Sequence, residues 1–326
     1  MTAAGSADAP ARREKSSKFK QWALAIGLTV VSAAVAAEIG LRITFKEFGR
    51  LYDIARPSGD SRSYELEPGA RTLYRGFWDV RTDPIAWTIN ADGLRSDREV
   101  PPRSARYRIM TYGDSETFGW ALDLEDTFQR RIEALDPDVE VLNMGVPGYN
   151  IANIADYLEK TIDRFRPDRV IYLSHKNDFD RALILSPILS KSWLYNAIRF
   201  IQVETGSRAR RAHRRTPEGY RAFMEQLRRL VEICRRRSIP LTVGVLHWEF
   251  EKAYRPVAEF AWTPGETATP PPFRTDVLNF NDIWYTMPKR DHHMAEGAHI
   301  EMAARFCKAI SEGGPGPCHP PERPAQ

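Results

Sequence analysis

The stretch Tyr107–Glu116, which reads YRIMTYGDSE, decides the fold. Its first six residues are typical of a β-strand, and a polar loop that contains Gly113 follows them. The same succession recurs along the chain. Further strands are predicted at 139–142, 170–173, 240–246 and 277–280, and helices at 127–135, 151–165, 298–310 and in a segment that begins at Pro217.

Strands that alternate with helices indicate βαβ units, because a crossover helix returns the chain to the same end of the sheet. The helix after Pro217 supports this pattern, since apolar residues from Tyr220 to Cys234 recur at the spacing of one buried helix face. We therefore predict an α/β fold, a three-layer sandwich in which a doubly wound parallel sheet is covered by helices on both faces.

The chain has 326 residues, enough for one sizeable α/β domain with additional segments. Proline and turn residues interrupt residues 42–103, where we expect a few short strands or loops and no separate core. The predicted organisation is a basic cytoplasmic tail (1–20), a signal anchor or transmembrane helix (21–41), an irregular connecting segment (42–103), the α/β domain (104–312) and a disordered tail (313–326).

The N-terminal segment predicts contact with a membrane. No charged residue occurs from Trp22 to Ala37, and residues 22–41 approach the ~20 residues that a span requires. Five basic and two acidic residues in 1–20 give a net charge of +3 before the apolar run, which favours a cytoplasmic N-terminus and a periplasmic or extracellular body. Ala34-Val35-Ala36 also fits a signal-peptide cleavage site, so a secreted, cleaved form is the alternative.

The rest of the chain is nearly neutral. The total charge of +4 leaves only +1 for residues 21–326, which provides no electrostatic argument for binding nucleic acid. Of the three cysteines, Cys234 falls on the apolar helix face and is expected in the core. Cys307 and Cys318 could form a disulfide if the domain is exported.

Polar residues follow the predicted strands at the edge where open parallel α/β sheets bind ligands. Gly113-Asp114-Ser115-Glu116 follows the first strand, and Asn143-Met144-Gly145 the second. His175-Lys176-Asn177-Asp178 follows the third, and Asp291-His292-His293 precedes the last helix. A serine, a glycine, an asparagine and a histidine are thus predicted to meet at one edge of the sheet.

These four blocks resemble the SGNH/GDSL hydrolase family, over roughly residues 104–312. The resemblance implies a flavodoxin-like sheet, no cofactor and no metal, and Ser115 as the nucleophile. It implies His293 as the base and Asp291 as the residue that orients it. The oxyanion hole would consist of the N–H groups of Ser115 and Gly145 and the side chain of Asn177.

The sequence departs from the family pattern at several positions. Glu116 follows the serine where the family has leucine, His175 stands where glycine is usual, and Asp291 lies two residues before His293 where three are common. His292 remains an alternative base. A metal site formed by His292, His293 and His299 is a further alternative, disfavoured by Gly297 near the start of the last helix.

Three functions remain open on these observations. The first is an ester hydrolase that forms a covalent acyl-Ser115 intermediate on an O-acylated envelope or extracellular substrate. The second is an O-acetyltransferase that acts on an envelope polysaccharide, with Trp120, Trp248 and Trp262 as candidate sugar platforms. The third is a non-catalytic glycan-binding or assembly factor, suggested by Glu116 and the altered histidine block.

Overall fold

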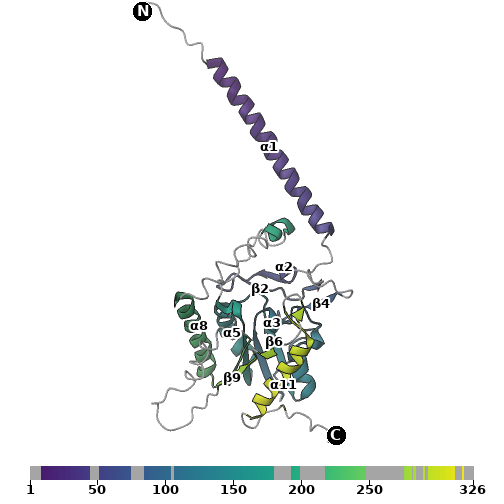
Figure 1. The fold of residues 1–326 in the computed structure, drawn as a ribbon, viewed down its shortest axis with the longest axis vertical. Coiled ribbons are helices and arrows are strands. Elements are labelled where there is room, and N and C mark those ends of the chain that lie inside the picture. Colours follow the sequence, from purple (N-terminus) through teal and green to yellow (C-terminus); the bar gives the residue numbers. More distant parts are fainter. Residues whose placement is uncertain are drawn as a thin grey trace, which may run out of the picture.

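A parallel five-stranded sheet forms the centre of the protein, here described from a computed structural model (Figure 1). The structure describes residues 9–44, 51–74, 84–103, 106–179, 192–198, 217–246, 275–280, 282–283, 289–290, 293–312 and 318. The strands are β5 (Tyr107–Gly113), β6 (Val139–Gly145), β7 (Arg169–Ser174), β8 (Leu241–Val245) and β9 (Thr275–Asn279). Their order in the sheet is β6-β5-β7-β8-β9, and all neighbours are parallel.

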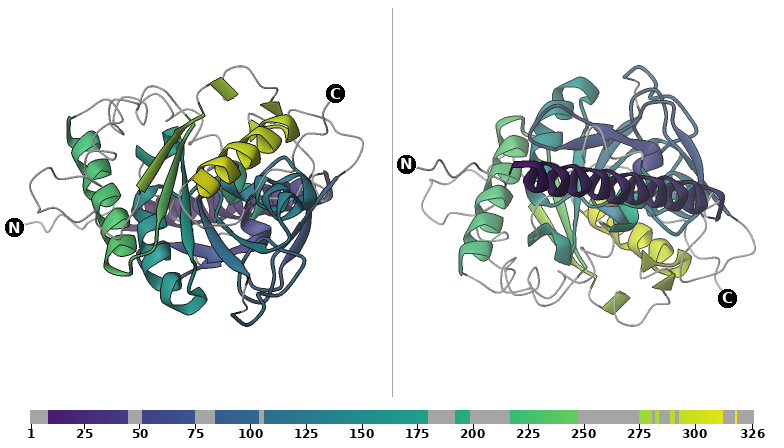
Figure 2. Two further views of the ribbon diagram at one scale, coloured as in Figure 1. Left: turned by 90° about the horizontal axis from the view of Figure 1, so that it is seen from below. Right: turned by 90° about the horizontal axis from the view of Figure 1, so that it is seen from above.

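Alternate strand residues build two separate cores, one on each face of the sheet. Met110 and Tyr112 pack with α5 (Ile151–Phe165) and α8 (Pro217–Arg236). Ile109, between them in the strand, packs on the other face with α4 (Phe128–Leu135) and α11 (Glu296–Glu312). Figure 2 shows the helices on both sides of the sheet. The predicted three-layer, doubly wound sandwich is confirmed.

The connecting segment 51–100 belongs to the same core. It forms α2 (Leu51–Ile54) and two antiparallel pairs, β1 (Ala55–Pro57) with β2 (Tyr64–Leu66) and β3 (Arg71–Tyr74) with β4 (Ile85–Thr88). Tyr64 and Trp87 are fully buried within the α5 and α8 core. The hydroxyl of Tyr64 donates to the Pro147 carbonyl at 2.7 Å, just beyond β6. The residues before and after the predicted boundary at residue 103 therefore share one hydrophobic core.

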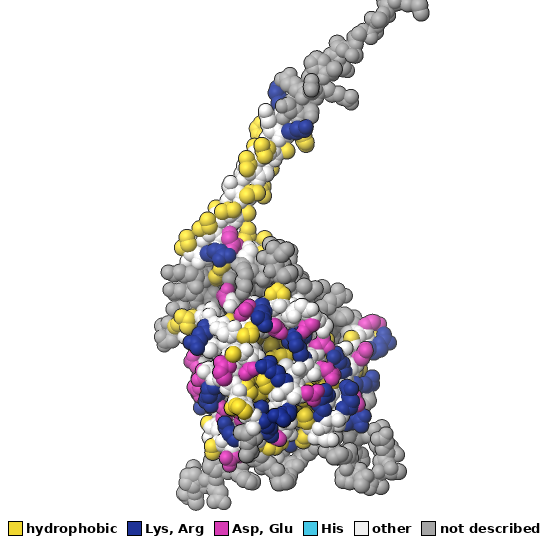
Figure 3. Space-filling model, turned by 180° about the vertical axis from the view of Figure 1, so that it is seen from behind, with side chains coloured by type: hydrophobic (Ala, Val, Ile, Leu, Met, Phe, Trp, Pro, Cys, Tyr) yellow, Lys and Arg dark blue, Asp and Glu magenta, His cyan; other side chains and the backbone are white. Residues whose placement is uncertain are grey.

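The N-terminal helix α1 (Ala9–Thr44) extends away from the body (Figure 1). Within residues 18–44, an 18-residue stretch with a mean hydropathy of 2.0 makes this helix apolar enough to span a membrane. Apolar side chains cover the middle of this helix, whereas Lys, Arg, Asp and Glu intermingle on the visible face of the body (Figure 3). Near the body, the Glu38 carboxylate accepts the N–H groups of Trp193 at 3.1 Å and Leu194 at 2.8 Å.

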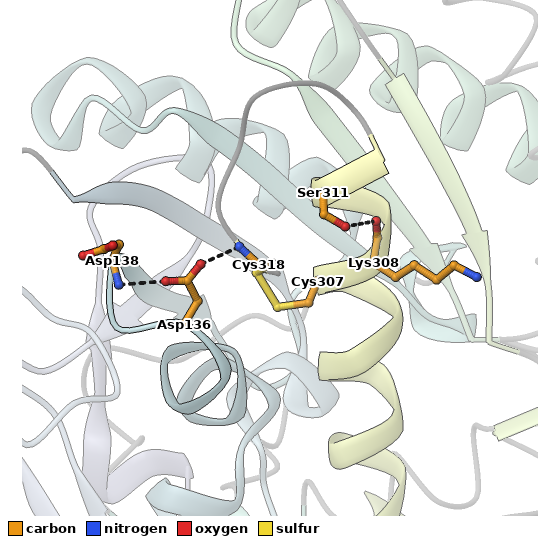
Figure 4. The surroundings of a disulfide bond; sticks show 6 residues. All are labelled: Asp136, Asp138, Cys307, Lys308, Ser311 and Cys318. Carbon is orange, nitrogen blue, oxygen red and sulfur yellow. Dashed lines mark hydrogen bonds between the residues drawn. A yellow bond between two sulfur atoms is a disulfide. The ribbon is translucent and has the colours of Figure 1, made fainter. Parts of the chain in front are cut away.

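A disulfide joins Cys307 of α11 to Cys318 (Figure 4). The N–H of Cys318 also donates to Asp136, at the end of α4, at 2.5 Å. Cys318 lies in the segment predicted as a disordered tail, but it is buried. The other residues from 313 onward lie outside the described part of the chain. Cys234 is a free, buried thiol, as its position on the apolar face of α8 predicts.

Candidate active site

Ser115 is the first residue of the short helix α3 (Ser115–Phe118), directly after β5. Asp114 caps this helix, and its Oδ1 accepts the N–H of Glu116 at 2.9 Å. At Gly113, a Cβ atom would lie 2.0 Å from Thr117 Oγ1. Glycine at the end of β5 therefore allows the chain to turn sharply and presents Ser115 at the carboxyl edge of the sheet.

This edge is the switch point of the sheet topology. The chain order of the strands across the sheet is 2-1-3-4-5, so β5 and β7 are neighbours whose connections leave in opposite directions. Crevices for ligands form at such points in open α/β sheets. Ser115 follows β5, and the 3₁₀-helix η2 (Lys176–Phe179) follows β7. The predicted serine and asparagine blocks therefore lie on either side of this switch point.

The structure brings His293 to the serine from 178 positions away. Its Nε2 lies 2.9 Å from Ser115 Oγ, within hydrogen-bond distance. His293 begins β11 (His293–Met294), which pairs with β10 (Lys289–Arg290). Asp291 and His292 lie outside the described residues, so the predicted Asp291–His293 pair and the alternative base His292 remain predictions.

Trp120 lies against the imidazole. Its ring stacks on that of His293 with centroids 5.8 Å apart, and its Nε1 donates to Tyr74 Oη at 2.7 Å. Tyr74 in turn stacks on Trp87 at 4.4 Å. The β3–β4 pair thus supports the dyad through an aromatic cluster, a role that the sequence of residues 42–103 did not predict. Trp248 and Trp262 lie outside the described residues.

The carboxyl group of Glu116 connects the nucleophile helix to the histidine strand. Its Oε2 accepts the N–H of Met294, the residue after His293, at 3.1 Å. Glu116 is buried, and its Oε1 has no hydrogen-bond partner among the described residues. Burial raises the pKa of Glu116 to about 7, and the Asp114 carboxylate contributes in the same direction.

A second buried contact involves Asp114, the residue before the serine. His175 Nδ1 is 3.0 Å from Asp114 Oδ2, so the residue that replaces the usual glycine of the third block is bonded to the cap of α3. Burial opposes the charged form of Asp114. The imidazole of His175 and the N–H of Glu116 nevertheless hold the pKa of Asp114 below its usual value. This contact couples the turn after β7 to the position of Ser115.

Asp178 stabilises that turn from within η2. Its Oδ2 accepts hydrogen bonds from the N–H of His175 at 2.8 Å and from the hydroxyls of Ser174 and Tyr172, each at 2.7 Å. Burial raises the pKa of Asp178 to about 7. Asn177, the predicted oxyanion donor, is half-buried beside it, and its Oδ1 has no partner among the described residues.

Gly145 has a structural role that the sequence did not predict. A Cβ atom at this position would lie 2.3 Å from the backbone nitrogen of Phe118, so only glycine lets β6 approach α3 this closely. Its N–H, the predicted oxyanion donor, donates to Asn143 Oδ1 at 3.0 Å. To serve the oxyanion, this N–H would have to share or release that bond.

Gly148 is a second candidate donor that sequence reasoning did not select. It lies in a turn closed by the Tyr149 N–H, which donates to the Val146 carbonyl at 3.1 Å. Its φ of +83° is in the region that glycine adopts readily. No hydrogen bond engages its N–H among the described residues. The Pro147-Gly148 pair is a turn signal, and it was the feature of the sequence that could have indicated Gly148 as a candidate.

His299 belongs to the core. It is buried, and its Nδ1 accepts the N–H of Phe128 at 3.1 Å. Burial lowers the pKa of His299 to about 3. In the described part of the chain, no three His, Cys, Asp or Glu side chains are grouped to hold a metal ion.

No protein-family model matches the chain, and no curated protein matches it. Solved structures do resemble it. A lipolytic protein of the G-D-S-L family from Desulfitobacterium hafniense is 15% identical over 61% of this chain and 96% of its own, with a TM-score of 0.38. A member of the same family from Veillonella parvula is 12% identical over 63% and 98%, with a TM-score of 0.42.

A salicylyl-acyltransferase from a tetracycline biosynthetic pathway is 15% identical, over 67% of this chain and 58% of its own, with a TM-score of 0.40. Identity and TM-score are low in all three comparisons. A function for this chain therefore has to be argued from its own residues and their geometry.

Proposed function

We propose that this chain is a serine ester hydrolase of the SGNH/GDSL type, with Ser115 as nucleophile and His293 as general base. The observation that carries the proposal is the 2.9 Å separation of Ser115 Oγ and His293 Nε2 at the switch point of the sheet. A serine hydroxyl becomes an effective nucleophile when an adjacent base accepts its proton. These two residues lie 178 positions apart in the sequence and yet meet at hydrogen-bond distance. A histidine that merely lay on the surface would have no reason to contact the serine.

In the proposed reaction, Ser115 Oγ attacks the acyl carbonyl and its proton passes to His293 Nε2. The tetrahedral intermediate collapses, and His293 protonates the departing alcohol oxygen. Water, deprotonated by His293, then attacks the acyl carbonyl, and as the Ser115 Oγ–acyl bond breaks, His293 returns the proton to Ser115 Oγ and the acid is released. Asp291 would hold the imidazole in the required tautomer, in the role of a triad carboxylate.

Negative charge on the intermediate requires preorganised donors. We propose the N–H of Ser115 and the side-chain amide of Asn177, which follow the neighbouring strands β5 and β7, as two of them. The glycine block would supply the third, either from Gly145, by sharing its bond with Asn143, or from Gly148. Loss of one such donor typically lowers kcat by ~10²–10³.

The test uses the full-length protein in detergent micelles, with p-nitrophenyl acetate as substrate and a fluorophosphonate as the serine label. We expect Ser115→Ala to abolish labelling and turnover and His293→Ala to slow both. Ser311→Ala is the matched control, because its hydroxyl bonds only within α11 in the described structure. Equal turnover in wild type and Ser115→Ala would overturn the proposal.

We further propose that the protein works at a membrane outside the cytoplasm. The apolar part of α1 is long enough to span a bilayer. The disulfide between Cys307 and Cys318 supports export, because disulfides persist mainly in oxidising compartments. In Figure 1, α11 runs from the side of the body that faces α1 toward the opposite side. Because α11 begins just after β11, which carries His293, we place the catalytic edge on the α1 side, where membrane-associated or envelope esters would be within reach.

The second candidate function is O-acetyl transfer to or from an envelope polysaccharide. The same acyl-Ser115 intermediate would pass its acyl group to a sugar hydroxyl instead of water. The stacking of Trp120 on His293 favours it, since an aromatic ring beside the base can support a sugar ring. Adding soluble glycan acceptors to the p-nitrophenyl acetate assay distinguishes the two: acetylated glycan indicates transfer, and free acetate alone indicates hydrolysis. The non-catalytic alternative predicts that fluorophosphonate leaves Ser115 unlabelled.

A further inference from the structure

Glu116 occupies an unusual position for an acidic residue. It follows the nucleophile directly, its side chain is 1% exposed, and it lies in the first turn of α3. A buried carboxyl group is costly unless its hydrogen bonds repay the loss of water. Its Oε2 accepts a hydrogen bond from the Met294 N–H at 3.1 Å. Its Oε1 has no partner among the described residues.

This bond joins the two halves of the dyad. Ser115 and Glu116 are consecutive in α3, and His293 and Met294 are consecutive in β11. The structure therefore connects the same two elements twice, once by the Ser115–His293 contact at 2.9 Å and once by the Glu116–Met294 bond beside it. The β10–β11 pair has only two residues in each strand, so its own ladder provides little rigidity.

Building on the proposed hydrolase function, we propose that Glu116 is a positioning residue of the dyad, which holds the His293 strand against the nucleophile helix through the Met294 N–H. It touches neither the substrate nor the reacting atoms. Its effect is to fix the distance over which the proton moves from Ser115 to His293.

The charge of Glu116 depends on pH and on its surroundings. Asp114 faces it from the cap of α3, His175 and Lys176 from the end of β7, and His293 lies next to its hydrogen-bond donor in β11. Burial raises its pKa to about 7. Both forms can accept the Met294 N–H, but a charged acceptor forms the stronger bond. Acidification therefore loosens the connection.

The test compares Glu116→Gln with Glu116→Leu in the full-length protein. Glutamine keeps an acceptor oxygen and removes the charge, whereas leucine keeps the approximate size and removes the acceptor. Turnover of p-nitrophenyl acetate is normalised to the number of sites that fluorophosphonate labels. Glu140→Gln is the matched control, because Glu140 is also a buried carboxylate, paired with Arg108 at the far end of the central strands.

We expect Glu116→Leu to lower kcat by about 10²-fold at nearly constant KM, because a displacement of ~1 Å in a catalytic group has that effect. Glu116→Gln keeps an acceptor but lacks the charge, so its rate should lie between those of the wild type and Glu116→Leu. The part of the acidic limb of the kcat profile that comes from Glu116 should be absent, since the glutamine side chain does not titrate. Glu140→Gln should leave kcat and the pH profile unchanged. A wild-type kcat in Glu116→Leu, or a Glu116→Gln variant as impaired as Glu116→Leu with an unchanged profile, would overturn the inference.

Amide hydrogen exchange at Met294 tests the bond without reference to activity. Protection that is lost in Glu116→Leu and kept in Glu116→Gln supports the inference, whereas equal protection in all variants overturns it. Absence of labelling and turnover in the wild type would instead overturn the hydrolase proposal. The exchange measurement would still decide whether Glu116 holds the histidine strand.

Discussion

Replacement of Gly145 by alanine would place a methyl group where the backbone of α3 already lies. The added Cβ would be 2.3 Å from the Phe118 nitrogen and 2.7 Å from the Thr117 carbonyl carbon, whereas ordinary contacts begin near 3.4 Å. The atoms that obstruct it belong to the main chain and cannot rotate away. Relief therefore requires the end of β6 and α3 to separate by about 1 Å.

Two effects should follow from this separation. Overpacking of this kind costs ~1–3 kcal/mol, which lowers the melting temperature of a domain of this size by about 2–12 °C. Ser115 begins the displaced helix, so kcat should also fall by about 10²-fold. Calorimetry measures the first effect, and turnover of p-nitrophenyl acetate per folded molecule measures the second.

Gly297→Ala is the matched control, since it lies in the first turn of α11 with no atom within 4 Å of its added Cβ. Alanine there should be neutral or stabilising by about 0.4–1 kcal/mol. An unchanged melting temperature in Gly145→Ala would refute the packing argument. Gly145 would then be available for the oxyanion role without a structural constraint.

Three further predictions concern other parts of the site and fold. Burial raises the pKa of Asp178 to about 7, so its stabilising contribution is complete below its unfolded pKa of ~4 and is lost as the pH rises to about 7. Asp178→Asn should therefore flatten the fall in melting temperature between about pH 4 and 7, and a curve parallel to that of the wild type would contradict this. Reduction of the Cys307–Cys318 disulfide should cost ~3 kcal/mol, or about 6–12 °C, and the reductant should have no effect on Cys307→Ala/Cys318→Ala. Trp120→Ala should lower kcat by about 2- to 10-fold and Trp120→Phe by less, because phenylalanine keeps an aromatic ring beside the imidazole of His293; equal losses would argue against stacking.

Most of the fold could be predicted because its signals are local and periodic. The helix 151–165 has the predicted bounds, and the strand predicted at 107–112 extends by one residue to Gly113. Strands buried on both faces appear as short apolar runs, and helices between them appear as one apolar stripe. The course of residues 51–100 was harder to predict from the sequence. Short antiparallel pairs such as β3 and β4 have no period long enough to indicate which core they join.

The site was predictable where a residue directly follows a long strand. Ser115 follows β5, and the turn that carries Asn177 follows β7, so parallel topology alone brings them to the same edge. His293 depends on β10 and β11, whose two-residue strands leave no pattern in the sequence. The contact of His175 with Asp114 could not be predicted from the sequence either, because it joins two turns that are 61 positions apart.

The glycine block shows that a motif can be recognised in the sequence while the role of each of its residues stays unassigned. Gly145, the last residue of β6, was predicted to donate its N–H to the oxyanion. This N–H already donates to Asn143, and the missing Cβ accommodates Phe118. Gly148, three residues on, has a positive φ in a turn and no bond to its N–H among the described residues. Both glycines fit the sequence pattern equally well, because composition does not record where an N–H group is already used. If Gly148 is the donor, Gly148→Ala should lower kcat, and because the φ of Gly148 is +83° the variant should lose stability through backbone strain, whereas Gly145→Ala loses it through overpacking. An oxyanion donor is therefore assigned by hydrogen-bond accounting, which requires coordinates.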